Sequence, residues 1–130
     1  MKFLLDTTIC IHALRQDRRV LDRLLAQQRS DVAVSIITEA ELRAGAAGST
    51  SGTKTVNLVE NFLRPLSILE FIAEDAAAYA RVREKLVRAE NPVGPLDVLI
   101  AAQAVARKLV LVSTNEFGRI GGLRVENWAA

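Results

Sequence analysis

The chain has 130 residues, of which 50% are hydrophobic and 25% are charged. This length and composition predict one globular domain, residues 1–130, with a substantial core and no room for a second domain. Its 17 basic and 15 acidic residues nearly balance, so the net charge of +2 does not by itself indicate a nucleic-acid partner.

Cysteine usage and the apolar runs indicate the compartment in which the chain works. The single cysteine, Cys10, excludes an internal disulfide and favours a reducing, cytoplasmic compartment. Asp6 interrupts the N-terminal apolar run before it reaches the length of a signal peptide. The longest weakly polar run, 98–106, is too short to span a bilayer, so we expect no membrane segment.

The first predicted strand ends in a carboxylate. Residues 3–5 are a short apolar run typical of a buried strand in a parallel sheet, and Asp6 follows directly. Ligands of open α/β sheets bind outside the carboxyl ends of the strands, which favours a functional role for Asp6. Asp is also a preferred helix N-cap, and taken alone the cap is the simpler interpretation.

Helices and strands alternate along the rest of the chain. Apolar residues recur at helical spacing in six segments, and short apolar runs between them indicate strands. This alternation predicts a parallel sheet with helices on both faces, with a polar loop at 45–53. We expect helices near 9–15, 20–28, 36–44, 56–64, 75–90 and 97–108, and strands at 32–34, 67–69, 109–112 and 123–125.

The helix expected at 36–44 carries two glutamates on different faces. Glu39 lies one turn before Arg43, where an exposed ion pair is the natural interpretation. Glu41 instead shares an apolar face with Ile37, Ala40 and Ala44. A carboxylate buried without a partner is costly, so either a cation reaches Glu41 or its side chain lines a cleft.

Two further acids follow ordered segments late in the chain. Asp97 comes after a loop that two prolines stiffen, and we expect it to open a helix whose buried face contains Ile100, Ala101 and Ala104. Glu116 follows the strong strand at 109–112 and is a fourth candidate.

Asp6, Glu41 and Asp97 together predict a cluster of carboxylates at one end of a parallel sheet. Packed carboxylates raise each other's pKa unless a cation joins them. One His and one Cys disfavour a zinc site, whereas oxygen ligands favour Mg²⁺ or Mn²⁺. Mg²⁺ with open water positions is suited to phosphodiester hydrolysis. The alternative is that these acids are separate caps and ion pairs.

Four short motifs occur in order: residues 4–11 (LLDTTICI), 35–42 (SIITEAEL, followed by Gly45), 92–102 (PVGPLDVLIAA) and 121–128 (GGLRVENW). Together they resemble the PIN-domain ribonucleases, specifically the VapC toxins of bacterial toxin–antitoxin pairs. The resemblance covers essentially the whole chain. It implies a PIN-like three-layer α/β/α fold with a central, mostly parallel sheet.

The resemblance also implies the activity. It describes the toxin of a type II toxin–antitoxin system, a Mg²⁺-dependent endoribonuclease for which Mn²⁺ can substitute. Asp6 and Asp97 are then the metal ligands, and Glu41 and Glu116 complete the catalytic set. The implied partners are a cognate VapB-type antitoxin, a second copy of the chain, and a structured RNA. Initiator tRNA is the expected substrate of the members that look most similar.

Two positions differ from the family pattern. Thr8 stands where the family usually has Asn; it can also hydrogen-bond and support a neighbouring carboxylate, but because it is shorter and β-branched we expect it to position that carboxylate less well. The loop after the fourth strand is shorter, so residues 113–117 must serve as the fourth motif, with Asn115 and Glu116 as its polar candidates. Two alternatives are a catalytically weak PIN-fold module that binds RNA or a partner, and a DNA nuclease of the same fold.

Overall fold

The computed structural model, which describes residues 1–130, is built around one sheet of five strands that all run parallel. The strands are β1 (Phe3–Leu5), β2 (Val32–Ser35), β3 (Ser67–Leu69), β4 (Val110–Val112) and β5 (Arg124–Glu126). Their order across the sheet is β3-β2-β1-β4-β5, so the first strand of the chain is the central one. Leu5 pairs with Val34 on one side and with Val112 on the other. The residues that follow these three therefore leave the sheet at one edge, its carboxyl edge.

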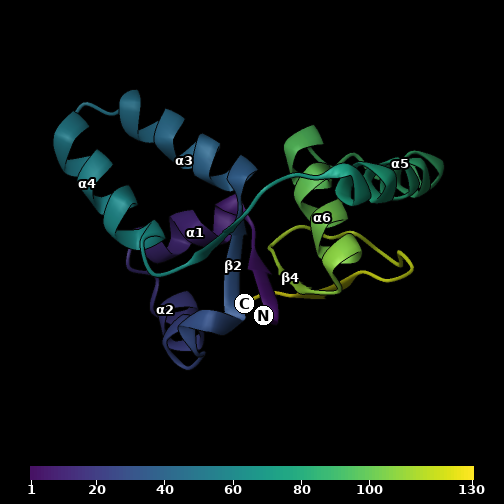
Figure 1. Ribbon diagram of the computed structural model, residues 1–130, viewed down its shortest axis with the longest axis horizontal. Coiled ribbons are helices and arrows are strands. Elements are labelled where there is room, and N and C mark those ends of the chain that lie inside the picture. The colour runs from purple at the N-terminus through teal and green to yellow at the C-terminus, as the bar shows by residue number, and fades with distance from the viewer.

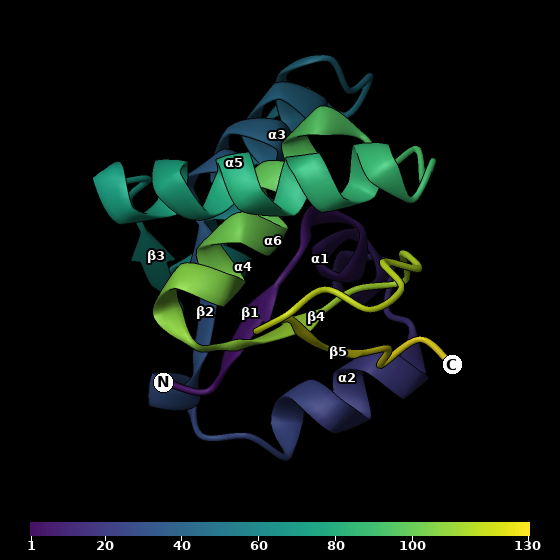
Figure 2. The same ribbon diagram turned by 90° about the vertical axis from the view of Figure 1, so that its right-hand side faces the viewer.

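Six α-helices cover the two faces of the sheet. The helices are α1 (Thr7–Leu14), α2 (Arg18–Leu25), α3 (Ile36–Ala47), α4 (Gly52–Leu63), α5 (Ala73–Arg88) and α6 (Pro95–Arg107), with a 3₁₀ turn (Arg29–Asp31) before β2. Helices α1 to α4 lie on one side of the strands, and α5 and α6 on the other (Figure 1). Figure 2 shows α5 and α6 in front of the central strands. The predicted three-layer architecture is confirmed. None of the helices combines the length and the apolar character that crossing a membrane requires.

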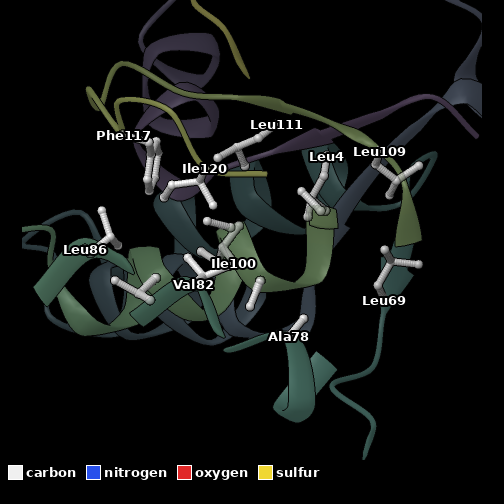
Figure 3. Packing of buried hydrophobic residues seen from close by; sticks show 14 of the residues in the cluster. Leu4, Leu69, Ala78, Val82, Leu86, Ile100, Leu109, Leu111, Phe117 and Ile120 are labelled. Carbon is white, nitrogen blue, oxygen red and sulfur yellow. The ribbon is translucent and has the colours of Figure 1, made fainter. Parts of the chain in front are cut away.

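Successive residues of the central strands face opposite helical layers. Leu4 and Leu111 belong to the core beneath α5 and α6, which Figure 3 shows from close by. Leu5 and Val112, the next residues along, belong instead to the core formed with residues of α1 to α4. All four are buried. Because both faces of the sheet are covered, each central strand is an unbroken apolar run rather than an alternating one.

The last residues of the chain are fastened to its N-terminal part. Trp128 is 1% exposed and packs edge-on against Phe3, with the ring centroids 5.1 Å apart. Its indole N–H donates to Glu126 at 3.0 Å, and the Arg23 guanidinium carbon lies 5.5 Å from the ring centroid. The aromatic pair and the cation–π contact hold the residues that follow β5 against Phe3 of β1 and Arg23 of α2.

Several helices have other limits than the apolar periodicity predicts; α4, for example, begins at Gly52 rather than near residue 56. Helix α3 continues through Gly45 to Ala47, so the loop expected at 45–53 shrinks to residues 48–51. Glycine lowers the stability of a helix by only about 1 kcal/mol, which neighbouring residues can offset. Helix α6 begins at Pro95 rather than at Asp97, because the fixed φ of proline suits the first helical position.

The residue that ends α6 gives a first prediction. Lys108 is exposed and adopts the left-handed conformation, with a φ of 56°. This conformation is unfavourable for a residue with a Cβ by about 1 kcal/mol and is freely accessible to glycine. Lys108→Gly is therefore expected to raise the free energy of unfolding, measured in urea, by about 1 kcal/mol. Lys85→Gly, in the body of α5, should lower it by a similar amount. Equal losses in both variants would contradict the strain argument.

Candidate active site

Asp6 stands at the carboxyl edge of the central strand, and its two oxygens have different surroundings. Oδ1 accepts the backbone N–H of Ile9 at 2.9 Å and so caps α1. Oδ2 is buried and has no hydrogen-bond partner. The helix cap suggested by the sequence is therefore present, but it uses only one of the two oxygens. A buried carboxylate oxygen without a partner is costly, which indicates a place for a ligand.

The surroundings of Asp6 disfavour its charged form. Asp6 is 2% exposed, and this burial is the largest effect that raises the pKa of its carboxyl above the ordinary value. The Ser113 hydroxyl, which lies near the carboxylate but beyond hydrogen-bond distance of Oδ2, and the Ile9 N–H lower the pKa, whereas the negative charges of Asp97 and Glu41 raise it further. The negative charges of Asp97 and Glu41 therefore reach Asp6 at this edge. A cation beside Asp6 would favour the charged carboxylate.

Asp97 reaches the same edge from the first turn of α6. Its side chain is half-buried, and the helix face that contains Ile100 and Ala101 is fully buried, as predicted. The turn before the helix packs closely on the carboxylate, because a Cβ added to Gly94 would lie 3.3 Å from Asp97 Oδ2. The N-terminal end of a helix carries a partial positive charge, which favours a carboxylate at this position.

Glu41 is brought to the site by α3 and is held by threonine hydroxyls. Thr7, the first residue of α1, donates from Oγ1 to Glu41 Oε1 at 2.6 Å. The same Thr7 oxygen lies 3.0 Å from Thr38 Oγ1. Thr8, which we expected to support a carboxylate, is exposed and makes no such hydrogen bond. The supporting hydroxyl therefore comes from the neighbouring residue of the same motif.

The face of α3 that packs on the core differs from the predicted one. Ala40 and Ala44, expected in a buried stripe with Glu41, are exposed. The large Leu42 turns inward instead, because it buries more apolar surface than the alanines would. Glu41 is half-buried and lines a pocket of about 300 Å³ between α1, α3 and α4. The buried residues of α3 are Thr38, Leu42 and Ala46.

The other glutamate of α3 is a surface residue, which confirms the prediction. Arg43 donates from Nε to Glu39 at 2.9 Å and from a terminal nitrogen to Glu60 at 2.7 Å. The hydrogen bond to Glu60, followed by that to Glu39, raises the pKa of Arg43. Glu39 is thus engaged away from the acidic site, and α3 contributes one acid to it.

Neither hydrogen bonds nor ion pairs join Glu116 or Asn115 to these acids. Glu116 is exposed, and its backbone carbonyl accepts the side-chain N–H of Asn91 at 2.9 Å. Asn115 is half-buried, and its backbone N–H donates to Ser113 Oγ at 2.9 Å. The loop after β4 therefore approaches Asp6 through Ser113, rather than through the two residues that the sequence singled out.

Sequence reasoning missed three hydroxyl residues of the site: Thr7, Thr38 and Ser113. Ser113 is 1% exposed and follows Val112 in the same register as Asp6 follows Leu5. A hydroxyl at the carboxyl end of a buried strand was the available signal for Ser113. Thr7 also follows a buried strand, but Thr38 had no such signal, and the contact between the two could not be anticipated because it joins two helices far apart in the sequence.

The donor set fits a hard divalent ion held by few protein ligands. No three His, Cys, Asp or Glu side chains are gathered closely enough to form a ready-made cage for a metal. Mg²⁺ commonly uses one or two carboxylates and keeps several waters, a requirement that Asp6 and Asp97 can meet. The unpartnered Asp6 Oδ2 is the observation that favours such an ion. Cys10 is buried in the core and His12 is paired with Asp17, so neither supplies a ligand here.

The chain is similar to known proteins over nearly its whole length. The family model for the PIN domain matches residues 3–119. The tRNA(fMet)-specific endonuclease VapC of Shigella flexneri is 34% identical over 131 residues, covering 99% of each chain. Ribonuclease VapC2 of Haemophilus influenzae is 37% identical and covers 98% of each chain.

A solved structure has the same fold throughout. The DNA-bound VapBC from Salmonella typhimurium contains a chain that superposes with a TM-score of 0.90 at 36% identity, covering 98% of both chains.

Proposed function

This chain belongs to the PIN-domain family, and within it to the VapC ribonucleases, and from that membership we propose that it is the toxin of a type II toxin–antitoxin pair. Its activity is then the divalent-metal-dependent endonucleolytic cleavage of structured RNA. The observation that carries the proposal is the buried Asp6 carboxylate, with one oxygen free, beside two further acids.

The acids of the site have separate roles in the proposed cleavage reaction. Asp6 and Asp97 would hold Mg²⁺, or Mn²⁺ in its place. The ion would supply charge stabilisation and an acidified water. Glu41, whose Oε1 is held by the Thr7 hydroxyl, would accept a hydrogen bond from the attacking water. The N-terminal end of α6, in whose first turn Asp97 lies, would add a partial positive charge to the site.

Incubating the purified chain with structured RNA, with Mg²⁺ and with EDTA, tests the activity. We expect cleavage with Mg²⁺ and none with EDTA. Binding of RNA without cleavage under both conditions would favour the alternative, a PIN-fold module that only binds. A single-stranded and a duplex DNA of matched length, tested in parallel, should stay intact; cleavage of DNA in preference to RNA would contradict the substrate class.

Initiator tRNA is the substrate that we propose within this class. Support comes from the VapC of Shigella flexneri and that of Salmonella typhimurium, both named as tRNA(fMet)-specific endonucleases and 34% and 35% identical to this chain. Initiator and elongator methionine tRNAs, compared as purified substrates at equal concentration, decide between specific and general cleavage. Equal rates on both would contradict the specificity.

The antitoxin is expected to neutralise the acidic site with a cation. The known VapBC structures are complexes. A site rich in carboxylates favours binding of an Arg or Lys side chain, because the planar guanidinium group of Arg can donate two parallel hydrogen bonds to a carboxylate. Apolar residues of the adjoining pocket, such as Ile11, Leu14 and Leu58, would hold the antitoxin beside Glu41. Replacing that cation by Met in the antitoxin should restore RNA cleavage while calorimetry still detects binding. If inhibition is undiminished, the block is steric and the idea is wrong.

Glu116 is proposed as an acid that orients water around the metal from the loop after β4. Carboxylates outside the first layer of ligands commonly change activity by about 10- to 100-fold. Glu116→Gln is therefore expected to lower the RNA cleavage rate about 10-fold, with a smaller change in Mg²⁺ affinity than Asp6→Asn causes. Glu84→Gln, an exposed acid paired with Arg88 on α5, is the control and should change neither. If Glu116→Gln also changes neither, the role passes to Asn115 or to none.

A further inference from the structure

Two threonine hydroxyls and one carboxylate form a continuous chain of hydrogen bonds beside Asp6. Thr7 Oγ1 donates to Glu41 Oε1 at 2.6 Å and lies 3.0 Å from Thr38 Oγ1. Thr38 is 0% and Thr7 is 7% exposed, so bulk water has little access to their hydroxyls. Thr7 opens α1, whereas Thr38 and Glu41 lie three residues apart on α3, where their side chains are neighbours.

The direction of each hydrogen bond follows from the number of protons. A threonine hydroxyl carries one proton, and an ionised carboxylate carries none. Because Thr7 gives its proton to Glu41, Thr38 must donate the bond between the two threonines. A threonine within a helix can donate instead to the carbonyl one turn earlier. Thr38 makes no such bond, so its proton is directed to Thr7.

We propose that Thr38 is a positioning residue for Glu41, an inference that rests on the function proposed above. The Thr38 hydroxyl donates a hydrogen bond to Thr7 Oγ1. This bond fixes the rotation of the Thr7 hydroxyl about its C–O bond. The Thr7 proton is thereby aimed at Glu41 Oε1. Hydrogen bonds to a carboxylate are short and strong, and bonds in a chain polarise one another. Thr38 itself touches neither substrate nor metal.

Two substitutions separate the hydroxyl of Thr38 from its shape. Thr38→Val keeps the branched side chain and removes the hydroxyl, whereas Thr38→Ser keeps the hydroxyl and removes the methyl group. We expect Thr38→Val to lower kcat for RNA cleavage about 10-fold, with KM for RNA unchanged, which is the lower end of the range for outer partners of metal-site residues. Thr38→Ser should stay within about twofold of the parent, because it restores the donor.

A measurement on the metal-free chain reads the position of Glu41 without any activity. The side-chain carboxyl carbon of Glu41 gives an NMR signal that is assigned by its loss in Glu41→Gln. We expect its chemical shift to be the same in the parent and in Thr38→Ser. In Thr38→Val it should move toward the chemical shifts of the exposed glutamates. Calorimetric titration with Mg²⁺ should give the same affinity in the parent and both variants, because Glu41 is not one of the two proposed metal ligands.

The outcomes are distinguishable. Coincident Glu41 signals and equal rates in Thr38→Val and the parent would overturn the role of Thr38, as would a Thr38→Ser variant that behaves like Thr38→Val. A purely structural role would lower the urea midpoint while leaving the rate and the carboxyl signal unchanged. If the parent neither binds Mg²⁺ nor cleaves RNA, the proposed function fails, and the carboxyl signal still decides whether Thr38 positions Glu41.

Discussion

Asp6→Asn is expected to abolish metal-dependent RNA cleavage while making the metal-free chain more stable. Loss of a metal-binding carboxylate should lower the cleavage rate about 1,000-fold or more, since a catalytic ion contributes several kcal/mol to the transition state. Asn caps helices as well as Asp does, so the bond from Ile9 to Oδ1 is retained. The variant loses a buried negative charge that Asp97 and Glu41 repel.

The gain in stability depends on pH in a defined direction. Burial and the neighbouring acids raise the pKa of Asp6 in the folded chain above its ordinary value of 3.8, so the folded state holds this proton more tightly than the unfolded state does. The stability of the parent therefore falls as pH rises from about 3.8 through the raised pKa, and it stays lower above it. The stability of Asp6→Asn does not fall in this way with rising pH, because Asn carries no ionisable proton.

Urea unfolding in EDTA at several pH values, together with an RNA cleavage assay, checks both parts. The stability of Asp6→Asn relative to the parent should grow from pH 4 toward neutral pH. Asp22→Asn, which removes an exposed partner of Arg18, is the control and should leave activity and stability nearly unchanged. A soluble Asp6→Asn that cleaves RNA at the parental rate would overturn the assignment of the site.

Arg107→Met is expected to have the largest effect on stability. Asp75 is 0% exposed, and Arg107 donates to both of its oxygens, at 3.1 and 3.0 Å. The remaining partners of Asp75 are the Ile72 N–H at 2.9 Å and the more distant Gln103 amide at 3.4 Å. Removing Arg107 leaves a buried charge without its cation, which should lower the free energy of unfolding by about 3–5 kcal/mol.

A matched substitution shows whether burial is the cause. Arg88→Met removes the partner of Glu84 in an exposed ion pair on α5, and exposed pairs contribute only about 0–1 kcal/mol. Chemical denaturation of the two variants should therefore differ by at least about 2 kcal/mol. Similar losses would mean that the contacts of Asp75 with the Ile72 and Gln103 N–H groups suffice for it.

The layers of the fold could be predicted from the sequence, because each depends on a local pattern. Short apolar runs mark strands that are covered on both faces, and the central strands β1, β2 and β4 are runs of this kind. The orientation of α3 could not be read in the same way. Its helical wheel offered a stripe of alanines beside Glu41, but packing favoured the larger Leu42. Periodicity identifies a helix more reliably than the face that it buries.

The acids of the candidate site were predictable where a single element places them. Asp6 follows a strand and Asp97 opens a helix, and both positions point to the carboxyl edge. The partners of these acids were not predictable, because Thr7 meets Glu41 across 34 residues of sequence. Such contacts depend on how helices pack, which no local spacing records. Glu116 was singled out from its charge and its place in the loop after β4, but neither feature indicates whether the side chain is buried, and the structure shows that it is exposed.

The central position of β1 has a consequence for the order in which the chain is made. The ribosome synthesises β1 first, but this strand lies between β2 and β4, and β4 ends only at Val112. A nascent chain therefore cannot pair β1 on both sides, or bring Ser113 beside Asp6, until β4 has been synthesised. The carboxyl edge at which Asp6 and Ser113 lie therefore forms only once β4 has joined β1.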